Sequence, residues 1–107
     1  MKWFDKPVFR IAYGIARVSL LEIKRQDTVS VICGNLKYIV KEFRVLAFFK
    51  ASNTFKTVTN FGGQLSNEAK DLFSQLKLED SVTFDSIIAI DPHGKEVNIS
   101  YSTITVY

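Results

Sequence analysis

The chain has 107 residues, of which 47% are apolar, 13% aromatic and 23% charged, and its formal net charge is +3. This length is typical of one domain, and the apolar content supports a buried core and excludes an intrinsically disordered chain. Cys33 and His93 are the only residues of their kinds. A structural zinc site needs about four such ligands, so this inventory excludes one, and it excludes an internal disulfide as well.

The first third of the chain predicts short strands. Residues 1–7 form a lead-in segment, and residues 8–12 are predicted to be a first strand. The apolar spacing of residues 16–25 fits a helix or a strand, and periodicity does not separate the two. Residues 28–33 are rich in β-branched side chains and predict a strand, which ends at the turn signal Gly34-Asn35.

Residues 36–51 show the strongest strand pattern of the chain. Both faces become apolar towards its C-terminal half, which indicates a central strand covered on both sides. The segment is longer than a usual strand, so we expect a β-bulge near Lys41–Glu42. One apolar face consists of Ile39, Phe43, Val45, Ala47 and Phe49.

A hairpin arm and a helix are predicted next. Residues 55–61 alternate Phe and Thr with Lys56 and Val58, as in a half-exposed strand. Ser66 is placed to cap one short amphipathic helix over about 67–77. Apolar side chains recur along this helix at helical spacing, so we expect one of its faces to pack onto a sheet.

Two strands are predicted in the last quarter of the chain. Residues 81–90 form one, with Val82, Phe84, Ile88 and Ile90 on one face, and Asp91-Pro92-His93-Gly94 has the composition of a β-turn. Residues 96–107 form the other. The apolar positions change parity between Tyr101 and Ile104, which predicts a bulge there.

Together these elements predict a mainly β fold. About seven strands, one helix and turn signals every 8–15 residues indicate an antiparallel, Ig-like β-sandwich. We expect a single domain over residues 1–107, because no repeat, low-complexity tract or linker interrupts the pattern.

Charge is unevenly distributed along the chain. Residues 1–56 hold 11 Lys or Arg and 4 Asp or Glu, a net charge of +7, and residues 57–107 hold 3 and 7, a net charge of −4. A solvated surface is the simplest interpretation. The functional one is a basic face that binds an acidic protein, or association between copies of the chain. The candidate partner-binding residues are Lys41, Arg44, Lys50 and Lys56.

Catalysis has weak support in the sequence. Cys33 and His93 could form a nucleophile–base pair only if they lie within hydrogen-bond reach, and each is better interpreted as a structural residue. No metal-ligand spacing, phosphate-binding loop or cofactor motif is present. The scattered basic residues argue against nucleic acid as a partner. The longest apolar run, residues 45–49, is too short to span a membrane.

Several blocks along the last 70 or so residues have the form of recurring motifs. Residues 43–48 match an aromatic strand of form F-x-V-x-x-F, and residues 61–66 resemble an N-G-x-x-L-[ST] entry to a helix. Residues 80–84 fit a G-D-x-V-x-F pattern in which Glu79 replaces the glycine. Residues 87–94 resemble an I-x-A-x-G-P-D-G turn, with Asp91 for Gly and His93 for Asp. The segment 20–26 resembles the one before the aromatic strand.

In their order and spacing these blocks resemble the C-terminal domain of the GldM/PorM family. The resemblance implies a β-sandwich with a helix and a non-catalytic role. In that family, an elongated periplasmic dimer of the gliding and type IX secretion motor of Bacteroidota contacts an outer-membrane-associated ring. The expectation is therefore a periplasmic protein–protein interaction module, whose partners are other envelope proteins or a second copy. No cofactor and no metal are expected. The alternative is a solo periplasmic sandwich that binds a small ligand or glycan through exposed aromatic rings.

Overall fold

The structure, a computed structural model, describes residues 8–10, 17–33 and 36–107. The predicted lead-in segment, the end of the first predicted strand and the predicted turn at 34–35 lie outside these residues. The elements are β1 (Val8–Arg10), β2 (Arg17–Val18), α1 (Leu20–Arg25), β3 (Ser30–Cys33), β4 (Leu36–Phe49), β5 (Thr54–Phe61), α2 (Asn67–Ser74), β6 (Ser81–Ile90), β7 (Glu96–Ile99) and β8 (Ser102–Val106).

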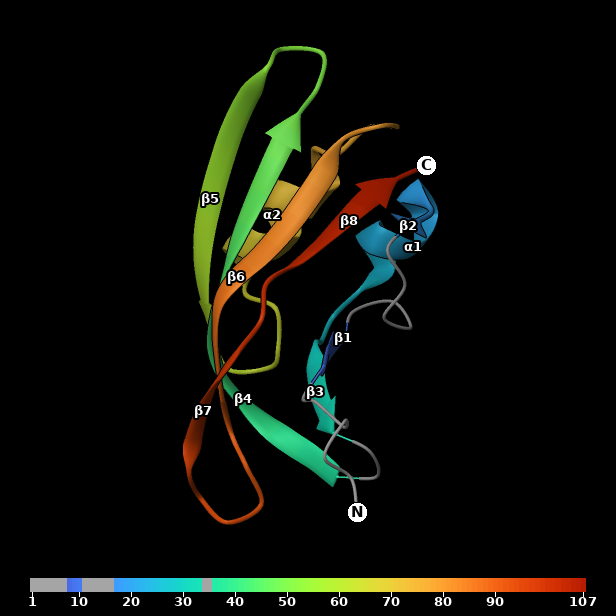
Figure 1. The fold of residues 1–107 in the computed structure, drawn as a ribbon. Coiled ribbons are helices and arrows are strands. Elements are labelled where there is room, and N and C mark those ends of the chain that lie inside the picture. The colour runs from blue at the N-terminus through green and yellow to red at the C-terminus, as the bar shows by residue number, and fades with distance from the viewer. Residues whose placement is uncertain (1–7, 11–16, 34–35) are drawn as a thin grey trace.

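The described strands form one sheet in the order β1-β3-β4-β6-β8-β2, with β5 beside β4 and β7 beside β6 (Figure 1). Every pairing is antiparallel except that of β2 with β8. The predicted mainly β class is confirmed. The sandwich arrangement stays a prediction, because the described strands are hydrogen-bonded into a single sheet.

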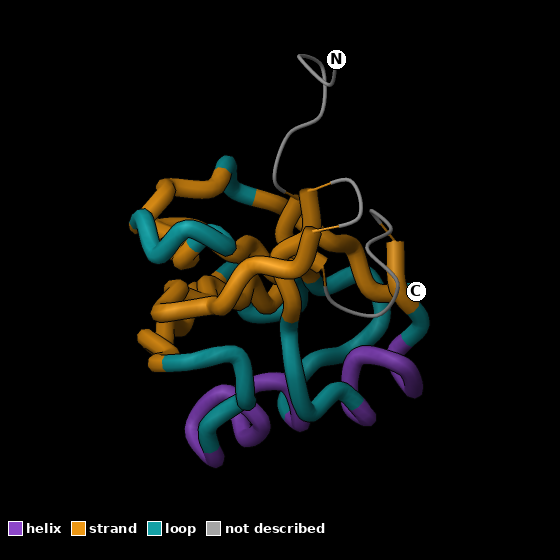
Figure 2. The backbone as a smooth tube through the Cα atoms, turned by 90° about the horizontal axis from the view of Figure 1, so that it is seen from below, coloured by secondary structure: helices purple, strands orange, loops and turns teal. Residues whose placement is uncertain are grey.

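Both helices lie on the same side of this sheet (Figure 2). Helix α2 begins where the sequence predicts, since the Ser66 hydroxyl accepts a hydrogen bond from the Ala69 N–H at 3.1 Å. It ends at Ser74 rather than at residue 77, with Gln75 as the cap. The ambiguous segment 16–25 contains β2 and the second helix α1, so the expectation of one helix is wrong for the described chain.

The core lies between the sheet and the helices. Phe43 of β4, Phe84 of β6 and Phe73 of α2 are almost fully buried. The ring centroids of Phe43 and Phe84 are 6.1 Å apart, and those of Phe73 and Phe84 are 6.3 Å apart at an interplanar angle of 79°. Edge-to-face packing of this kind adds about 0.5–1.5 kcal/mol per pair to the free energy gained by burial.

Strands β4 and β6 carry two irregularities that compensate each other. Val40 pairs with Ala89 and Glu42 with Ile88, so β4 has an additional residue at Lys41. The next pair is Arg44 with Asp85, so β6 has an additional residue there, and Ser86 takes a φ of +50°. The predicted bulge near Lys41–Glu42 is confirmed. The second irregularity returns the two strands to their original register.

These irregularities change which side chains are buried. Ile39 was expected on the face of Phe43, but it is 66% exposed, because the bulge between them reverses the alternation. On β6, Ile87 and Ala89 are buried in place of the predicted Ile88 and Ile90. An alternation of period two cannot be extended through a bulge, so these two predictions are wrong.

The final predicted strand is divided into β7 and β8. Both pair with β6, and the register of Ile87 with Ile99 continues to Phe84 with Ser102. The change of parity is confirmed, but it occurs at a break in the strand and not at a bulge within a single strand. The preceding turn is confirmed. Asp91 Oδ1 accepts hydrogen bonds from the backbone N–H groups of His93 and Lys95, each at 2.9 Å.

Glu79, between α2 and β6, has a φ of +75°. This left-handed conformation favours glycine and is costly for other residues, by about 1–2 kcal/mol. The position is the one at which the GldM/PorM pattern has glycine. The Glu79 carboxylate also binds Lys50 Nζ at 3.1 Å, in an exposed ion pair that contributes little.

We therefore predict that Glu79→Gly leaves the free energy of unfolding within about 0.5 kcal/mol of the native value, because relief of strain offsets the added chain entropy. Glu79→Val should lower it by about 1–2 kcal/mol, since a β-branched residue tolerates positive φ poorly. Chemical denaturation of both variants tests this. A Val variant as stable as the Gly variant would contradict it.

Candidate functional site

Arg44, near the centre of β4, forms a bidentate ion pair with Asp85 of β6. Its Nε donates to Asp85 Oδ1 at 2.7 Å and its Nη2 to Asp85 Oδ2 at 2.6 Å, which is a bidentate pair. The hydrogen bonds that Arg44 donates to Asp85, and the negative charge of that carboxylate, raise the pKa of Arg44. The same guanidinium hydrogen bonds lower the pKa of Asp85.

Lys41 and Lys50 are also paired with acids from the second half of the chain. Lys41 Nζ lies 2.7 Å from Glu96 Oε2 on β7, and the hydrogen bond to this carboxylate raises the pKa of Lys41. Lys50 pairs with Glu79, as described above. Antiparallel pairing thus places the basic residues of β4 beside Asp85 of β6 and Glu96 of β7. The charge polarity of the sequence is therefore neutralised locally at three of the four predicted partner-binding residues.

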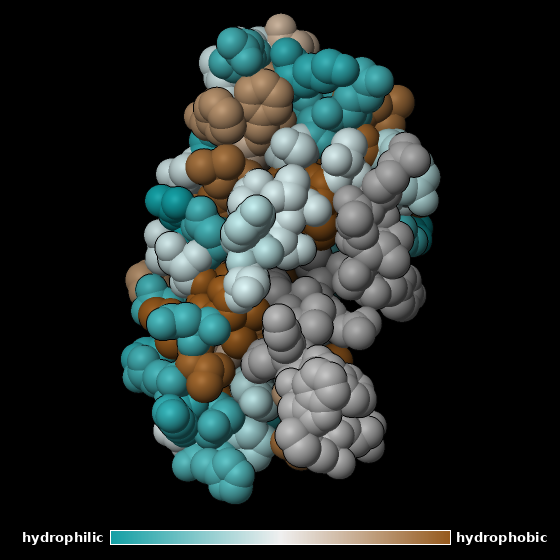
Figure 3. Space-filling view, viewed as in Figure 1, coloured by the Kyte–Doolittle hydropathy of each residue, from teal (hydrophilic) through white to brown (hydrophobic). Residues whose placement is uncertain are grey.

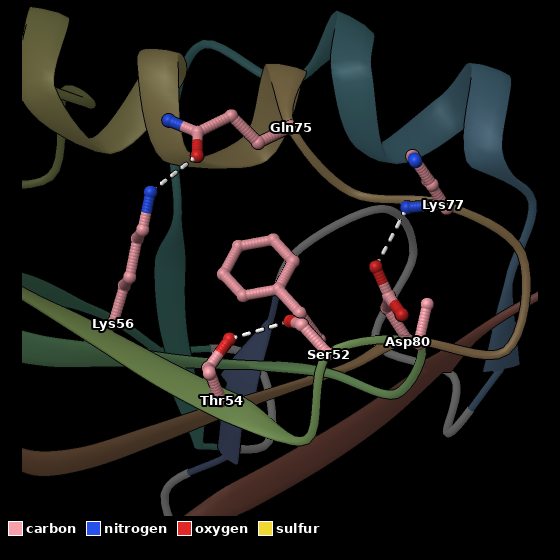
Figure 4. Close-up of a pocket in the computed structure, with 8 residues that line it drawn as sticks. Ser52, Thr54, Lys56, Gln75, Lys77 and Asp80 are labelled. Atoms are coloured by element: carbon pink, nitrogen blue, oxygen red, sulfur yellow. Dashed lines mark hydrogen bonds between the residues drawn. The ribbon is translucent and has the colours of Figure 1, made fainter.

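Lys56, the fourth, lies on β5 and points towards α2 (Figure 4). Its Nζ donates to Gln75 Oε1 at 2.8 Å and stands 5.7 Å from the centre of the Phe49 ring. These residues border a pocket of about 260 Å³ between the β4–β5 turn and the C-terminal end of α2. Its remaining polar lining includes Ser52, Thr54, Lys77 and Asp80.

The polar groups of this pocket bind one another. Ser52 Oγ and Thr54 Oγ1 are 2.6 Å apart. Asp80 is buried and accepts from the backbone N–H groups of Lys50 at 2.9 Å and Lys77 at 2.8 Å. Asp80 thereby joins the β4–β5 turn to the α2–β6 connection. The volume is below the roughly 300–1,000 Å³ of typical ligand pockets, so this pocket is better explained as structural.

The outer face of the sheet, opposite the helices, is a larger candidate surface. We define it by the side chains that alternate with the buried ones on four neighbouring strands. They are Arg44, Leu46 and Phe48 of β4, Phe55, Thr57, Thr59 and Phe61 of β5, Thr83 and Asp85 of β6, and Thr103 and Thr105 of β8.

Apolar and polar groups alternate across this outer face. The Phe48 and Phe55 rings are 4.8 Å apart, and Phe55 and Phe61 remain 62% and 74% exposed. Thr83 Oγ1 and Thr103 Oγ1 are 3.1 Å apart. Figure 3 shows this side of the molecule, with brown apolar side chains among pale and teal polar ones. Its rings and the Arg44–Asp85 ion pair give the face both apolar contact area and fixed charges.

Cys33 and His93, the possible nucleophile and base, lie on separate elements. Cys33 ends β3 beside Tyr38, whose pKa is raised by partial burial and by the neighbouring thiol. His93 is exposed in the β6–β7 turn. Among the described residues, no hydrogen bond joins their side chains, and no cluster of three or more His, Cys, Asp or Glu could hold a metal ion.

No protein-family model matches this chain, and no curated protein matches it. Within the described segments, neither helix is long and apolar enough to cross a membrane.

The sequence missed the two features that organise the candidate surfaces. No sequence pattern indicates the role of Asp80, whose buried carboxylate accepts two backbone N–H groups and holds two loops together. The exposure of Phe55 and Phe61 was not anticipated as a feature of one face. Their alternation with Val58 and the buried Asn60 was the available signal, because residues two apart on a strand share a face.

The Arg44–Asp85 pair predicts an acid-sensitive contribution to stability. The pKa of Asp85 is lower in the folded chain than in the unfolded chain, so the contribution is complete above about pH 5 and disappears as the pH falls through the folded value. Arg44 is 45% exposed and Asp85 25%, which limits the pair to about 1 kcal/mol. Urea denaturation between pH 7 and pH 2.5 should show a smaller loss for Asp85→Asn than for the native chain. Equal losses would contradict this.

Proposed function

We propose that this chain is a non-catalytic protein–protein interaction module of a bacterial cell-envelope complex, and that it binds its partner through the outer face of the sheet. The observation that carries the proposal is the outer face itself. The inner face is covered by α1 and α2, whereas the outer face keeps Phe55 and Phe61 exposed beside the ordered Arg44–Asp85 pair. Exposed apolar patches rimmed by polar residues commonly mark interaction sites.

The chemistry of this face suits a folded protein partner. Leu46, Phe48 and Phe55 offer apolar area that a partner can desolvate, and the Phe48–Phe55 contact fixes two of the rings. The Arg44–Asp85 pair presents charges in a defined geometry, which favours register and specificity more than affinity. A β-sheet face of this kind is also nearly rigid, so little conformational entropy is lost on binding.

The proposed location in the periplasm, within a cell-envelope complex, rests on the resemblance to the GldM/PorM C-terminal domain. The aromatic block 43–48 lies in β4, the block 80–84 enters β6, and the block 87–94 ends β6 and makes the following turn. The positive φ of Glu79 supports the resemblance further, because the family pattern has glycine at this position. We accordingly propose that the partners of this chain are proteins of the same envelope complex.

The alternative of a small-ligand or glycan site has less support. Phe55 and Phe61 are six residues apart on one strand, which is about 20 Å, and neither lines the pocket of Figure 4. The polar groups around that pocket already bind one another.

An exchange of charges tests the outer face without removing its ion pair. Arg44→Asp combined with Asp85→Arg keeps opposite charges in contact but reverses what a partner meets. Arg44→Glu alone places two carboxylates together. We expect both variants to weaken the binding of an envelope protein by about tenfold, which corresponds to roughly 1.4 kcal/mol. The partner is first captured by the native chain from solubilised envelopes of the source bacterium, then purified and measured by titration.

Lys24→Glu is the matched control, because it makes the same charge change on α1, on the side of the helices. It should bind as the native chain does. Thermal unfolding checks that every variant is folded. Native affinity in the exchanged variant would contradict the role of the outer face, and an equal loss in Lys24→Glu would indicate non-specific charge attraction.

A further inference from the structure

Strand β5 leaves one of its edges unpaired in the described structure. Its eight residues pair with β4 in an uninterrupted register, from Phe49 with Thr54 to Glu42 with Phe61. No described strand pairs with its other edge, and β5 forms the left border of the sheet in Figure 1. A straight edge of this length, without Pro or bulge, offers its backbone groups to another strand.

The hydrogen bonds of the hairpin show which backbone groups are available. The Gly62 N–H donates to Lys41 O at 2.7 Å. Bonded positions alternate along an antiparallel pair, so Asn60, Val58 and Lys56 also direct their backbone groups towards β4. Phe55, Thr57, Thr59 and Phe61 therefore direct theirs towards the open edge. Their side chains are those of the outer face.

The sequence of this edge is nearly palindromic about Val58. The order is Phe55-Lys56-Thr57-Val58-Thr59-Asn60-Phe61, so Phe and Thr recur at equal distances on both sides. A strand with this symmetry is complementary to itself in the antiparallel direction, because a two-fold axis through Val58 places like residues opposite each other. We propose that a second copy of this chain pairs with β5 along this edge and makes one continuous sheet across the dimer.

The backbone pattern agrees with this register. Thr57 lies opposite Thr59 of the second copy, and both direct their N–H and C=O groups to the open edge, so they can exchange two hydrogen bonds. Phe55 lies opposite Phe61 of the second copy in the same way. Rings that are 62% and 74% exposed in one chain then cover each other, and aromatic cross-strand pairs stabilise sheets.

The side towards the helices is complementary too. Helix α2 runs antiparallel to β5, since the Ser66 N–H binds Asn60 Oδ1 at one end and Gln75 binds Lys56 at the other. Between them lies a groove of about 400 Å³ that includes Val58 and the acidic Glu68 and Asp71. The register places Lys56 opposite Asn60 of the second copy, at the end of α2 where that copy carries Glu68. Lys56 of each copy can therefore approach Glu68 of the other copy across the axis.

Sedimentation equilibrium of the full chain over about 5–500 μM tests the association. We expect a monomer–dimer equilibrium, and we expect Thr57→Pro to raise the dimer dissociation constant at least tenfold. The proline removes an N–H that faces the open edge and leaves the bonds to β4 in place. Phe61→Lys should have the same effect. Leu78→Lys changes a side chain of similar exposure away from β5 and should leave the constant unchanged.

A cysteine test reports the register. In a Cys33→Ser background, Val58→Cys places two thiols opposite each other at a non-bonded pair, where the Cα atoms are about 4.5 Å apart. It should form an intermolecular disulfide under mild oxidation. Phe61→Cys is more exposed, but its two copies would be separated by about 20 Å, so it should not. Crosslinking at 61 in preference to 58 would overturn the proposed register.

A chain that stays monomeric at every concentration would overturn the proposal. The test of dimerisation is independent of the test of partner binding, because the Arg44–Asp85 exchange does not alter the backbone edge of β5. Native dimerisation of the exchanged variant, together with weakened binding of the envelope partner, would support both proposals. An exchanged variant that is folded but stays monomeric would overturn the pairing along β5, because its backbone edge is unaltered.

Discussion

The pairing of β4 with β6 is the constraint on which the rest of the structure depends. Each strand contributes one additional residue near the middle, and because the two irregularities compensate, the register at both ends is the same. Phe43 and Phe84 meet below the sheet on one side of this point. On the other side the buried positions move to Val40, Ile87 and Ala89. A single uncompensated bulge would reverse the burial of half of one strand.

The same pairing determines where the charges lie. A basic first half and an acidic second half would repel or attract other molecules strongly if they formed separate surfaces. They do not, because β4 lies beside β6 and β7, and Lys41 and Arg44 are paired with Glu96 and Asp85. Charge polarity along the sequence therefore contributes to cohesion between the two halves. What a partner meets is a face of ordered ion pairs and aromatic rings.

Local features could be predicted from the sequence, and features of register could not. The Ser66 cap, the Asp91 turn and the bulge at Lys41 depend on residues near one another in the chain. The second irregularity, at Ser86, carries no distinctive sequence, and it alone decides whether Ile87 or Ile88 is buried. The candidate site followed the same division. Arg44 was among the predicted residues, but its pairing with Asp85 depends on the long-range register of β4 with β6.

The sheet has three surfaces with different chemical requirements. The inner face is mainly apolar and is covered by α1 and α2, so its apolar side chains are buried within the chain. The outer face is mixed, and its threonines and ion pairs let it remain in water until a partner binds. The edge of β5 is different. If its backbone N–H and C=O groups are removed from water, only pairing with another strand replaces all of their hydrogen bonds. The near-palindrome about Val58 makes the chain itself a suitable source of that strand. Dimerisation along the edge would leave the outer face continuous across both copies, so that a partner could bind two equivalent sites at once and gain effective concentration at the second.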